Sequence, residues 1–136
     1  MTVTISVRYE GGLRCTARHG PSDTALTTDA PVDNQGRGES FSPTDLVATA
    51  FATCTMTIMG IVAERDGLPV TGIAAEVEKH MAADPRRIAA LPLTLRVSGP
   101  LDEAQRSALE TAARGCPVCH SLSPDIRCEI RFEYDG

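Results

Sequence analysis

Residues 42–67 read SPTDLVATAFATCTMTIMGIVAERDG, and this stretch decides the fold. No charged residue occurs between Asp45 and Glu64, and the large apolar residues fall on every side of a helix with 3.6 residues per turn. Ser42 and Asp45 have the spacing of a capping box, and Pro43 suits the first helical position. The stretch is about long enough to cross a bilayer, but its many threonines and alanines favour a buried core helix.

The composition is that of one acidic globular domain. A chain of 136 residues can bury a single core, so we expect one domain over residues 1–136. It has 13 Lys and Arg against 18 Asp and Glu, a net charge of -5, which argues against a nucleic-acid partner. Residues 1–10 lack the layout of a signal peptide, so we expect a cytoplasmic protein with no membrane partner. In a reducing compartment its five cysteines are expected to be free, metal-bound or redox-active.

Alternating apolar and polar residues predict strands on both sides of the central helix. Residues 29–41 are rich in glycine and polar residues and predict a loop, and residues 81–90 predict an exposed link between two strands. Residues 101–112 have the spacing of an amphipathic helix that ends at Gly115. The sequence therefore predicts an α+β domain. Its expected strands are residues 3–9, 13–17, 25–28, 73–80, 91–98 and 126–134.

The candidate chemistry lies in residues 115–122, which read GCPVCHSL. Cys116 stands where an N-cap would, and Pro117 suits the first position of a short helical turn. The free N–H groups and the helix dipole at such a position favour a thiolate, so this position is expected to lower the pKa of Cys116. Cys119 follows one turn later, and the adjacent His120 could stabilise a thiolate or donate a proton.

Four interpretations of this segment remain open from the residues alone. C-x-x-C-H is also a c-type haem attachment pattern, but no export signal precedes it. A zinc site could combine Cys116, Cys119 and His120 with Cys54 or His80, although structural zinc usually draws on two close-spaced ligand pairs. A thioredoxin-like C-x-x-C normally follows a strand, whereas this one follows a predicted helix. Finally, the cysteines could simply be small buried hydrophobic residues.

Two stretches occur together here: SPTDLVATAFATCT at residues 42–55 and LETAARGCPVCHSL at residues 109–122. With TDAP at residues 28–31, they resemble the OsmC/Ohr family of osmotically inducible protein C and organic hydroperoxide resistance proteins, and the likeness covers nearly the whole chain. The resemblance implies an OsmC-like α+β fold with antiparallel sheets around a long buried central helix. It also implies an intertwined homodimer that exchanges N-terminal strands and shares its active site.

The function that this resemblance implies is hydroperoxide reductase, a cysteine-based peroxidase. In such proteins the mid-helix cysteine, here Cys54, attacks the O–O bond of an organic hydroperoxide and becomes a sulfenic acid. The cysteine of Cys-Pro-Val, here Cys116, condenses with it to a disulfide, which an external dithiol of the dihydrolipoyl type reopens. The resemblance implies no metal and no bound cofactor.

A buried Cys54 thiol would have a raised pKa, so a nearby cation is expected to offset the desolvation. The family uses an arginine from the early strands, steadied by a glutamate near the start of the central helix. By position Arg14 is the closest match, and Arg18 and Arg37 are alternatives.

The carboxylate departs from the family pattern. Thr44 directly follows Pro43, and the acid comes one place later, at Asp45. At about 100° per residue, Asp45 lies on the opposite side of the helix from Cys54, so we expect it to cap the helix. Glu39, just upstream, is the other candidate for the missing carboxylate.

Two further cysteines lie outside these motifs, and two other functions are alternatives to the peroxidase. Cys15 and Cys128 lie on apolar faces of strands and are expected to pack in the core. The alternatives to a peroxidase are a thiol-disulfide exchange or metal-binding protein that uses Cys116 and Cys119, and a non-catalytic OsmC-like protein that binds a small apolar ligand.

Overall fold

The computed structural model describes all 136 residues, which form two compact units. The N-terminal unit comprises residues 1–46, and the C-terminal unit comprises residues 47–136. Helix α1 (Pro43–Arg65) begins in the first unit and continues into the second. Strands and helices alternate in blocks along the chain rather than in regular βαβ units, which confirms the predicted α+β class.

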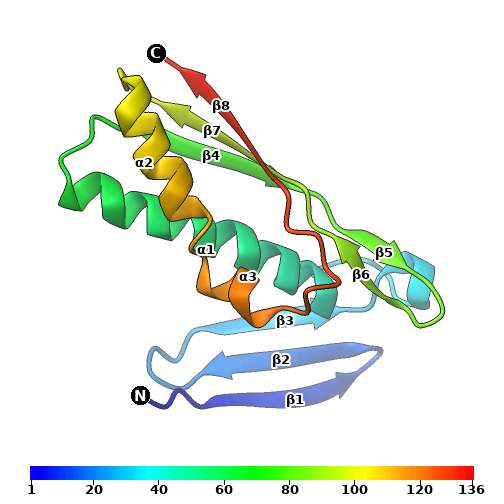
Figure 1. Cartoon of the computed structure of the whole chain (residues 1–136). Helices are drawn as coiled ribbons and strands as arrows, with labels where there is room; N and C mark the ends of the chain where they lie inside the picture. Colours follow the sequence, from blue (N-terminus) through cyan, green and yellow to red (C-terminus); the bar gives the residue numbers. More distant parts are fainter. The chain divides into compact units, whose positions relative to one another are not determined.

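The N-terminal unit is a three-stranded antiparallel meander in which β2 lies between β1 and β3 (Figure 1). The turn between β1 and β2 contains Gly11 and Gly12, whose φ angles of 85° and 62° are left-handed and suit glycine. The predicted hairpin and third strand are therefore confirmed. The elements of this unit before α1 are β1 (Ile5–Gly11), β2 (Arg14–His19), β3 (Ala25–Asp29) and the 3-10 turn η1 (Val32–Asn34).

One face of the meander is apolar and exposed. The strand register places Val7 opposite Ala17, and Ala17 opposite Leu26. Val7 is 65% exposed and Leu26 is 45% exposed. A contiguous exposed apolar surface usually marks an interaction site. We call this surface the N-terminal apolar face, and it consists of Ile5, Val7, Tyr9, Cys15, Ala17 and Leu26.

Helix α1 begins as the sequence predicts. The N–H of Asp45 donates to Ser42 Oγ at 3.1 Å, and the N–H of Ser42 donates to Asp45 Oδ2 at 2.9 Å, which forms the predicted capping box. Pro43 is the first helical residue. By length and composition alone, α1 could cross a membrane; this is weak support for a span, because the core helix of a soluble protein passes the same test.

The buried residues of α1 form one stripe instead of covering every side of the helix. Thr53, Thr57 and Ile61 are exposed. The hydroxyl of Thr53 donates to the carbonyl of Thr49 at 2.8 Å, and the hydroxyl of Thr57 donates to the carbonyl of Thr53 at 2.7 Å. The backbone of α1 itself therefore satisfies these exposed hydroxyl groups. The core-facing stripe consists of Ala48, Phe51, Ala52, Thr55, Met59 and Ala63.

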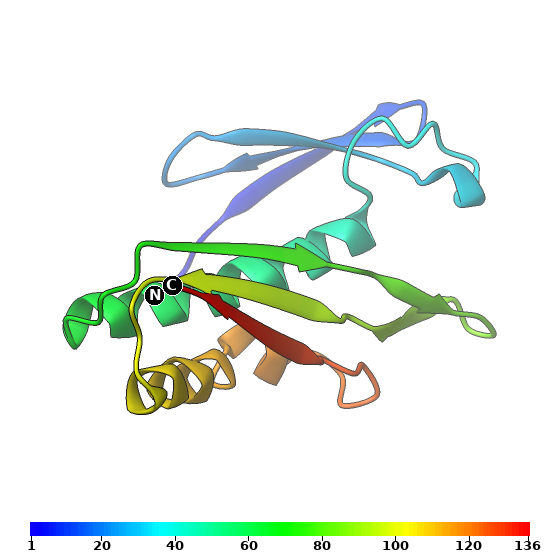
Figure 2. The same cartoon turned by 90° about the horizontal axis from the view of Figure 1, so that it is seen from above.

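The C-terminal unit is built on a sheet with the strand order β4-β7-β8 (Figures 1 and 2). Strand β4 is antiparallel to β7, whereas β8 is parallel to β7. Parallel neighbours need a crossover, which helices α2 and α3 provide. Alternate residues of the three strands share one hydrophobic core with α1 and α2, so both helices cover the same face. The elements are β4 (Gly72–Val77), β7 (Leu93–Ser98), β8 (Ile130–Asp135), α2 (Glu103–Ala113) and α3 (Pro117–Ser121).

Two details of this unit differ from the sequence prediction. Residues 81–90 are not an exposed excursion, because they form most of a hairpin of β5 (His80–Ala82) and β6 (Arg87–Ala90) in which Ile88 is buried. The last strand begins at Ile130, four residues later than predicted. The preceding residues are held instead by single backbone hydrogen bonds to the chain around residues 89–93.

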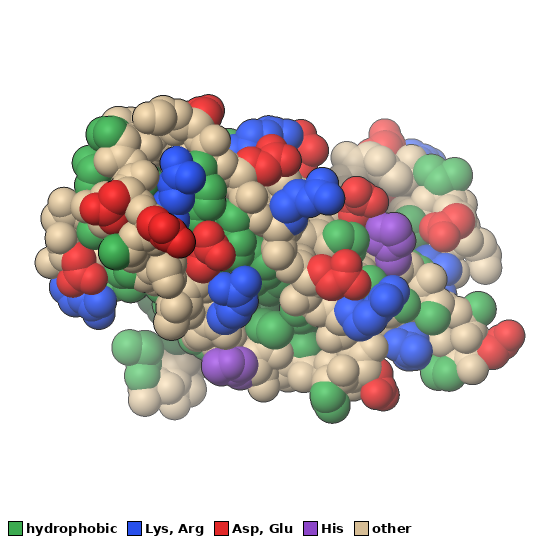
Figure 3. All heavy atoms as spheres, turned by 45° about the horizontal axis from the view of Figure 1, so that its top comes forward, with side chains coloured by type: hydrophobic (Ala, Val, Ile, Leu, Met, Phe, Trp, Pro, Cys, Tyr) green, Lys and Arg blue, Asp and Glu red, His purple; other side chains and the backbone are tan.

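The other face of this sheet is polar. Arg96 on β7 lies 3.4 Å from Glu76 on β4 and 3.4 Å from Glu133 on β8. Acidic and basic side chains are interspersed on the face that Figure 3 shows. Mixed charges of this kind cover the sheet but form no single-sign patch for a polyanionic partner.

Candidate functional site

Two of the predicted cysteines meet in the C-terminal unit. Cys54 lies in the middle of α1 and is half-buried, whereas Cys116 precedes α3 and is fully buried. The side chain of Cys116 is close enough to the Cys54 thiol to raise its pKa, although the two residues are 62 positions apart in the sequence, and both thiols are free. The role of this pair stays a prediction.

Local sequence signals place Cys116 at this point. Helix α2 ends at Ala113 with Arg114 as its C-cap, and the N–H of Gly115 donates to the carbonyl of Ala112 at 3.0 Å. Cys116 is the extended N-cap residue of α3, with Pro117 at the first helical position as predicted. The chain thus turns sharply between two helices, which directs this short segment back toward α1.

The surroundings of Cys54 act on its thiol in opposite directions. Burial raises the pKa of Cys54, the backbone N–H of Val118 lowers it by hydrogen bonding to the sulfur, and Cys116 raises it again. The net direction is upward. Within the C-terminal unit, Cys54 is therefore held mainly as a neutral thiol, and a nucleophilic role needs a further positive charge.

A second pair of thiols lies in the same unit. Cys119 on α3 lies near Cys128, which is just before β8. Burial, then Cys119, then the charge of Cys116 raise the pKa of Cys128 to about 12. Cys128 packs against the core as predicted. Its proximity to Cys119 is an additional feature that strand periodicity could not indicate.

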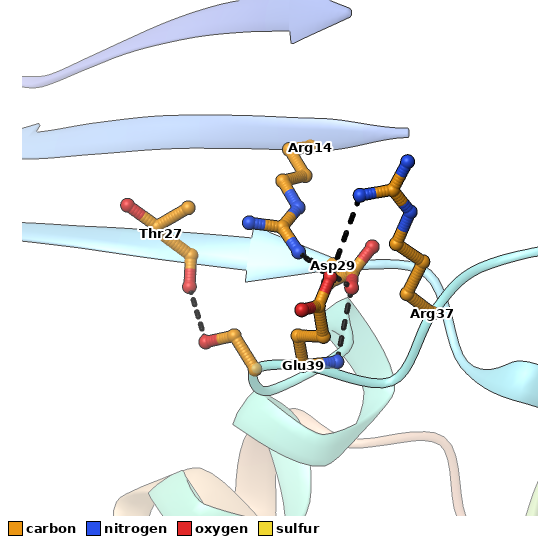
Figure 4. Close-up of polar contacts among 6 residues, drawn as sticks. Arg14, Thr27, Asp29, Arg37 and Glu39 are labelled. Atoms are coloured by element: carbon orange, nitrogen blue, oxygen red, sulfur yellow. Dashed lines mark hydrogen bonds and ion pairs between the residues drawn. The ribbon is translucent and has the colours of Figure 1, made fainter. Parts of the chain in front are cut away.

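The predicted arginine lies in a carboxylate cluster of the N-terminal unit (Figure 4). Arg14 on β2 forms ion pairs with Glu39 and, at 3.4 Å, with Asp29 at the end of β3. Arg37 lies 3.8 Å from Glu39. The prediction that Arg14 and Glu39 form a pair agrees with this geometry, and we call Arg14, Asp29 and Glu39 the arginine cluster.

Comparisons with known proteins place the chain in a family. The family model described as OsmC-like protein matches residues 36–131. A crystal structure from Psychrobacter arcticus shares 44% sequence identity over 98% of this chain and 96% of that chain, with a TM-score of 0.91. The chain belongs to the OsmC-like protein family. That Psychrobacter protein is described as an osmotic stress induced and detoxification response protein.

More distant relatives share the OsmC-like fold. An organic hydroperoxide resistance protein OsmC from Legionella pneumophila has a TM-score of 0.74 at 18% identity, covering 98% of this chain and 97% of that chain. The organic hydroperoxide resistance protein OhrB of Bacillus subtilis has a TM-score of 0.68 at 17% identity and covers 98% of each chain. No curated protein sequence matched the OsmC-like chain.

Asp29 is the member of the arginine cluster that sequence analysis did not assign to the site. Its side chain is fully buried, and its Oδ2 accepts the N–H of Glu39 at 3.0 Å as well as the ion pair from Arg14. The Glu39 N–H and, to a smaller extent, Arg14 hold the pKa of Asp29 below its usual value, against the opposing effect of burial. The TDAP motif at residues 28–31 was the available signal.

We expect Asp29→Asn to remove a pH-dependent part of the stability of this OsmC-like protein. Because the folded pKa of Asp29 is below 3.8, the ionised carboxylate stabilises the protein above pH 3.8, and this contribution is lost as the pH falls through the folded pKa. The urea concentration at the midpoint of unfolding should therefore differ most between wild type and variant at pH 5 to 7. The two midpoints should converge below pH 3.8. The exposed Glu10→Gln serves as control, and a constant difference at all pH values would contradict the prediction.

The other candidate residues of the OsmC-like chain lie outside these two clusters. Asp45 caps α1, as its helical position indicated. His120 is exposed in the last turn of α3. Arg18 is exposed and pairs with Asp23 at 3.0 Å. No group of three or more His, Cys, Asp or Glu side chains is arranged to hold a metal ion, so the geometry offers no support for the alternative zinc site.

Proposed function

We propose that this OsmC-like protein is a cysteine-based thiol peroxidase that reduces organic hydroperoxides. Membership of the OsmC-like family supports a redox or peroxide-related role. The observation that carries the proposal is the proximity of the free Cys54 and Cys116 thiols, which lets Cys116 act on the pKa of Cys54. A disulfide needs its two Cα atoms within about 7 Å of each other, so only thiols that are neighbours in the fold can be joined in this way.

The reaction starts at the Cys54 thiolate. Its sulfur attacks the terminal oxygen of the hydroperoxide, the O–O bond breaks, and the alkoxide takes up a proton and leaves as an alcohol. Cys54 is then a sulfenic acid. The Cys116 thiol attacks this sulfur, a disulfide forms, and water leaves. An external dithiol of the lipoyl type reduces the Cys54-Cys116 disulfide and is itself oxidised to a disulfide.

Ionisation of Cys54 requires the arginine cluster in this proposal. The Val118 N–H alone does not offset burial, since the pKa of Cys54 is raised. We assign the missing positive charge to Arg14, which Glu39 and Asp29 hold in a fixed position. Because the carboxylate partner comes from Glu39 and Asp29, Thr44 can stand where the family pattern has a glutamate.

We further propose that the two units of each chain act as one OsmC-like domain. Two such chains form a homodimer through the N-terminal apolar face and share the active site. The exposed fractions of Ile5 (57%), Val7 (65%) and Tyr9 (63%) support this proposal, because burying such a surface is favourable by roughly 25 cal/mol per Å². The expected location remains the cytoplasm.

Light scattering after size-exclusion chromatography should give about twice the chain mass of 14.4 kDa. The variant Val7→Lys places a charge in the N-terminal apolar face and should weaken the dimer. The matched control Arg8→Lys lies on the other side of β1 and should leave the mass unchanged. A monomeric wild-type protein would overturn the dimer and its shared active site, and the thiol chemistry of Cys54 and Cys116 is tested separately.

The peroxidase itself is tested with Cys116→Ser. This variant removes the resolving thiol, so cumene hydroperoxide should convert Cys54 to a sulfenic acid that persists and reacts with dimedone. Mass spectrometry should find the adduct on Cys54, with turnover by a dithiol reduced about 100-fold or more. Glu10→Gln is the control, because Glu10 is exposed and lies outside both the thiol pairs and the N-terminal apolar face. If wild type loses no thiol with hydroperoxide, the non-catalytic ligand-binding alternative is favoured.

A further inference from the structure

The proposed peroxidase cycle needs Cys116 to reach the Cys54 sulfur, and helix α2 is the element that leads to Cys116. The chain passes from the C-cap residue Arg114 through Gly115 directly to Cys116 and α3 (Figure 1). The carbonyl of Cys116 accepts the N–H of His120 at 3.2 Å, and the Cys116 side chain is fully buried. The position of this thiol therefore depends on how the end of α2 is held.

One side of α2 is attached to strand β8. Arg106, Glu110 and Arg114 are spaced four residues apart, so they lie along one side of the helix. On β8, Phe132 and Tyr134 are two residues apart and share the face of the strand that packs on the core. Side chains of these two rows contact each other between α2 and β8.

The central contact between the two rows is a hydrogen bond. The hydroxyl of Tyr134 donates to Glu110 Oε2 at 2.5 Å in a partly buried position. Burial, and then the Glu110 carboxylate, raise the pKa of Tyr134, so the phenol remains a donor at neutral pH. A hydrogen bond to an ionised acceptor is stronger than one between neutral groups.

Two arginines add to this hydrogen bond. Cζ of Arg106 lies 4.5 Å from the centre of the Tyr134 ring, and Cζ of Arg114 lies 5.4 Å from the centre of the Phe132 ring, which are cation–π distances. Arg114 Nη1 also donates to the carbonyl of Glu110 at 3.1 Å and so satisfies a carbonyl of the last turn of α2. We call these five residues the α2–β8 contact.

We propose that Glu110 and Tyr134 are positioning residues for the resolving step, because they hold the end of α2 where Cys116 can attack oxidised Cys54. This inference rests on the proposed peroxidase function, which supplies that step. The Cys116 sulfur bonds to the sulfur of the Cys54 sulfenic acid, the S–O bond breaks, and the leaving hydroxide takes up the Cys116 proton and departs as water. Glu110 and Tyr134 act on this step through the backbone of α2.

The attack of Cys54 on the hydroperoxide should depend much less on the α2–β8 contact. Cys54 lies in the middle of α1, whose start is held by its own capping box and whose buried stripe packs in the core. The N–H of Val118 on α3 also acts on Cys54, so a small effect of a displaced α3 is expected. Loss of the α2–β8 contact should therefore slow disulfide formation far more than hydroperoxide consumption.

The test follows the two steps separately in Tyr134→Phe, which removes the hydroxyl and keeps the ring. Reduced protein is mixed with cumene hydroperoxide and quenched with acid at increasing times. The remaining hydroperoxide reports the attack, and the Cys54-Cys116 disulfide, mapped by mass spectrometry after alkylation, reports the resolving step. Disulfide formation should be about 10-fold slower than in wild type. Hydroperoxide consumption in the first turnover should change by no more than about threefold.

Variants of Glu110 test the same hydrogen bond from its other side. Glu110→Gln keeps an acceptor for Tyr134 and should stay within about threefold of the wild-type rate of disulfide formation, whereas Glu110→Ala should be about 10-fold slower. This pair of variants carries the test if Tyr134→Phe does not fold. Glu133→Gln is the matched control, because Glu133 lies on the other face of β8 and pairs with Arg96.

A second measurement needs no hydroperoxide. Because Cys116 is fully buried in the reduced protein, iodoacetamide can reach it only when this segment opens locally. Tyr134→Phe should raise the alkylation rate of Cys116 about 10-fold, since the variant loses a hydrogen bond to a charged group. Glu133→Gln should leave that rate unchanged.

The possible results separate this inference from the proposed function. A folded Tyr134→Phe that forms the disulfide at the wild-type rate would overturn the inference and leave the peroxidase standing. Equal slowing of both steps would also overturn it, because the hydroxyl would then support the whole site instead of Cys116. A wild-type protein that consumes no hydroperoxide would overturn the peroxidase and the resolving step with it, and the alkylation rates would still show whether the α2–β8 contact holds Cys116.

Discussion

Replacing Cys54 with serine is expected to abolish hydroperoxide-dependent thiol loss in this protein. The hydroxyl of serine cannot attack an O–O bond at neutral pH, and the proposed cycle has no other attacking thiol. Removal of a nucleophile typically reduces the rate by about 10³-fold or more. The measurement is the consumption of cumene hydroperoxide in the presence of a dithiol, followed with free-thiol titration.

Two controls make the Cys54→Ser result specific. Glu10→Gln changes an exposed side chain of the N-terminal unit outside the N-terminal apolar face and should retain the wild-type rate. Circular dichroism should be the same for wild type and Cys54→Ser, since the two side chains are similar in size and Cys54 is only half-buried. Wild-type turnover by a folded Cys54→Ser would contradict the assignment of Cys54 as the attacking residue.

Replacing Arg14 with methionine is expected to lower the peroxidase rate at pH 7 by about 100-fold, because a fixed charge that stabilises a developing anion is typically worth this much. Loss of the guanidinium would leave the Cys54 thiolate without its proposed counter-charge. Burial already raises the pKa of Cys54, so the thiolate fraction at neutral pH should fall further. Consequently the variant should regain activity as the pH rises, whereas wild type should reach its plateau at a lower pH.

The pH profile separates an electrostatic role from a structural one. Arg14→Lys keeps a positive charge but loses the geometry that pairs with both Asp29 and Glu39, so it should recover part of the rate. Arg18→Met is the matched control on the same strand, because Arg18 is exposed and pairs with Asp23 instead. If Arg18→Met lowers the rate and Arg14→Met does not, the arginine has been assigned incorrectly.

The local signals in the sequence were sufficient for most of the secondary structure. The capping box at Ser42 and Asp45 set the start of α1, and Gly115 with Pro117 set the break between α2 and α3. Where the signals were weak, the prediction failed. Residues 81–90 look like a polar link, but pairing of β5 with β6 and burial of Ile88 turn them into a hairpin.

The candidate site was only partly predictable from the sequence. The family resemblance and the cysteine spacing selected Cys54 and Cys116, position in the early strands selected Arg14, and position just upstream of the central helix selected Glu39. The partnership between Cys119 and Cys128 was not foreseen, because an apolar-face cysteine in a strand looks like any core residue. Asp29 was missed for a similar reason, since a carboxylate at the end of a strand usually belongs to a turn.

The sequence by itself determined most of the helices and strands, the start of α1, and which thiols stand at a helix start or in a helix interior. These features depend on residues within about four positions of each other, through hydrogen bonds to the local backbone. Only the tertiary structure decided which thiols are neighbours and which carboxylates hold Arg14. The thiol pairs depend on how α1, α3 and the chain before β8 pack together, and the ion pairs of Arg14 depend on how β2, β3 and the following loop fold together.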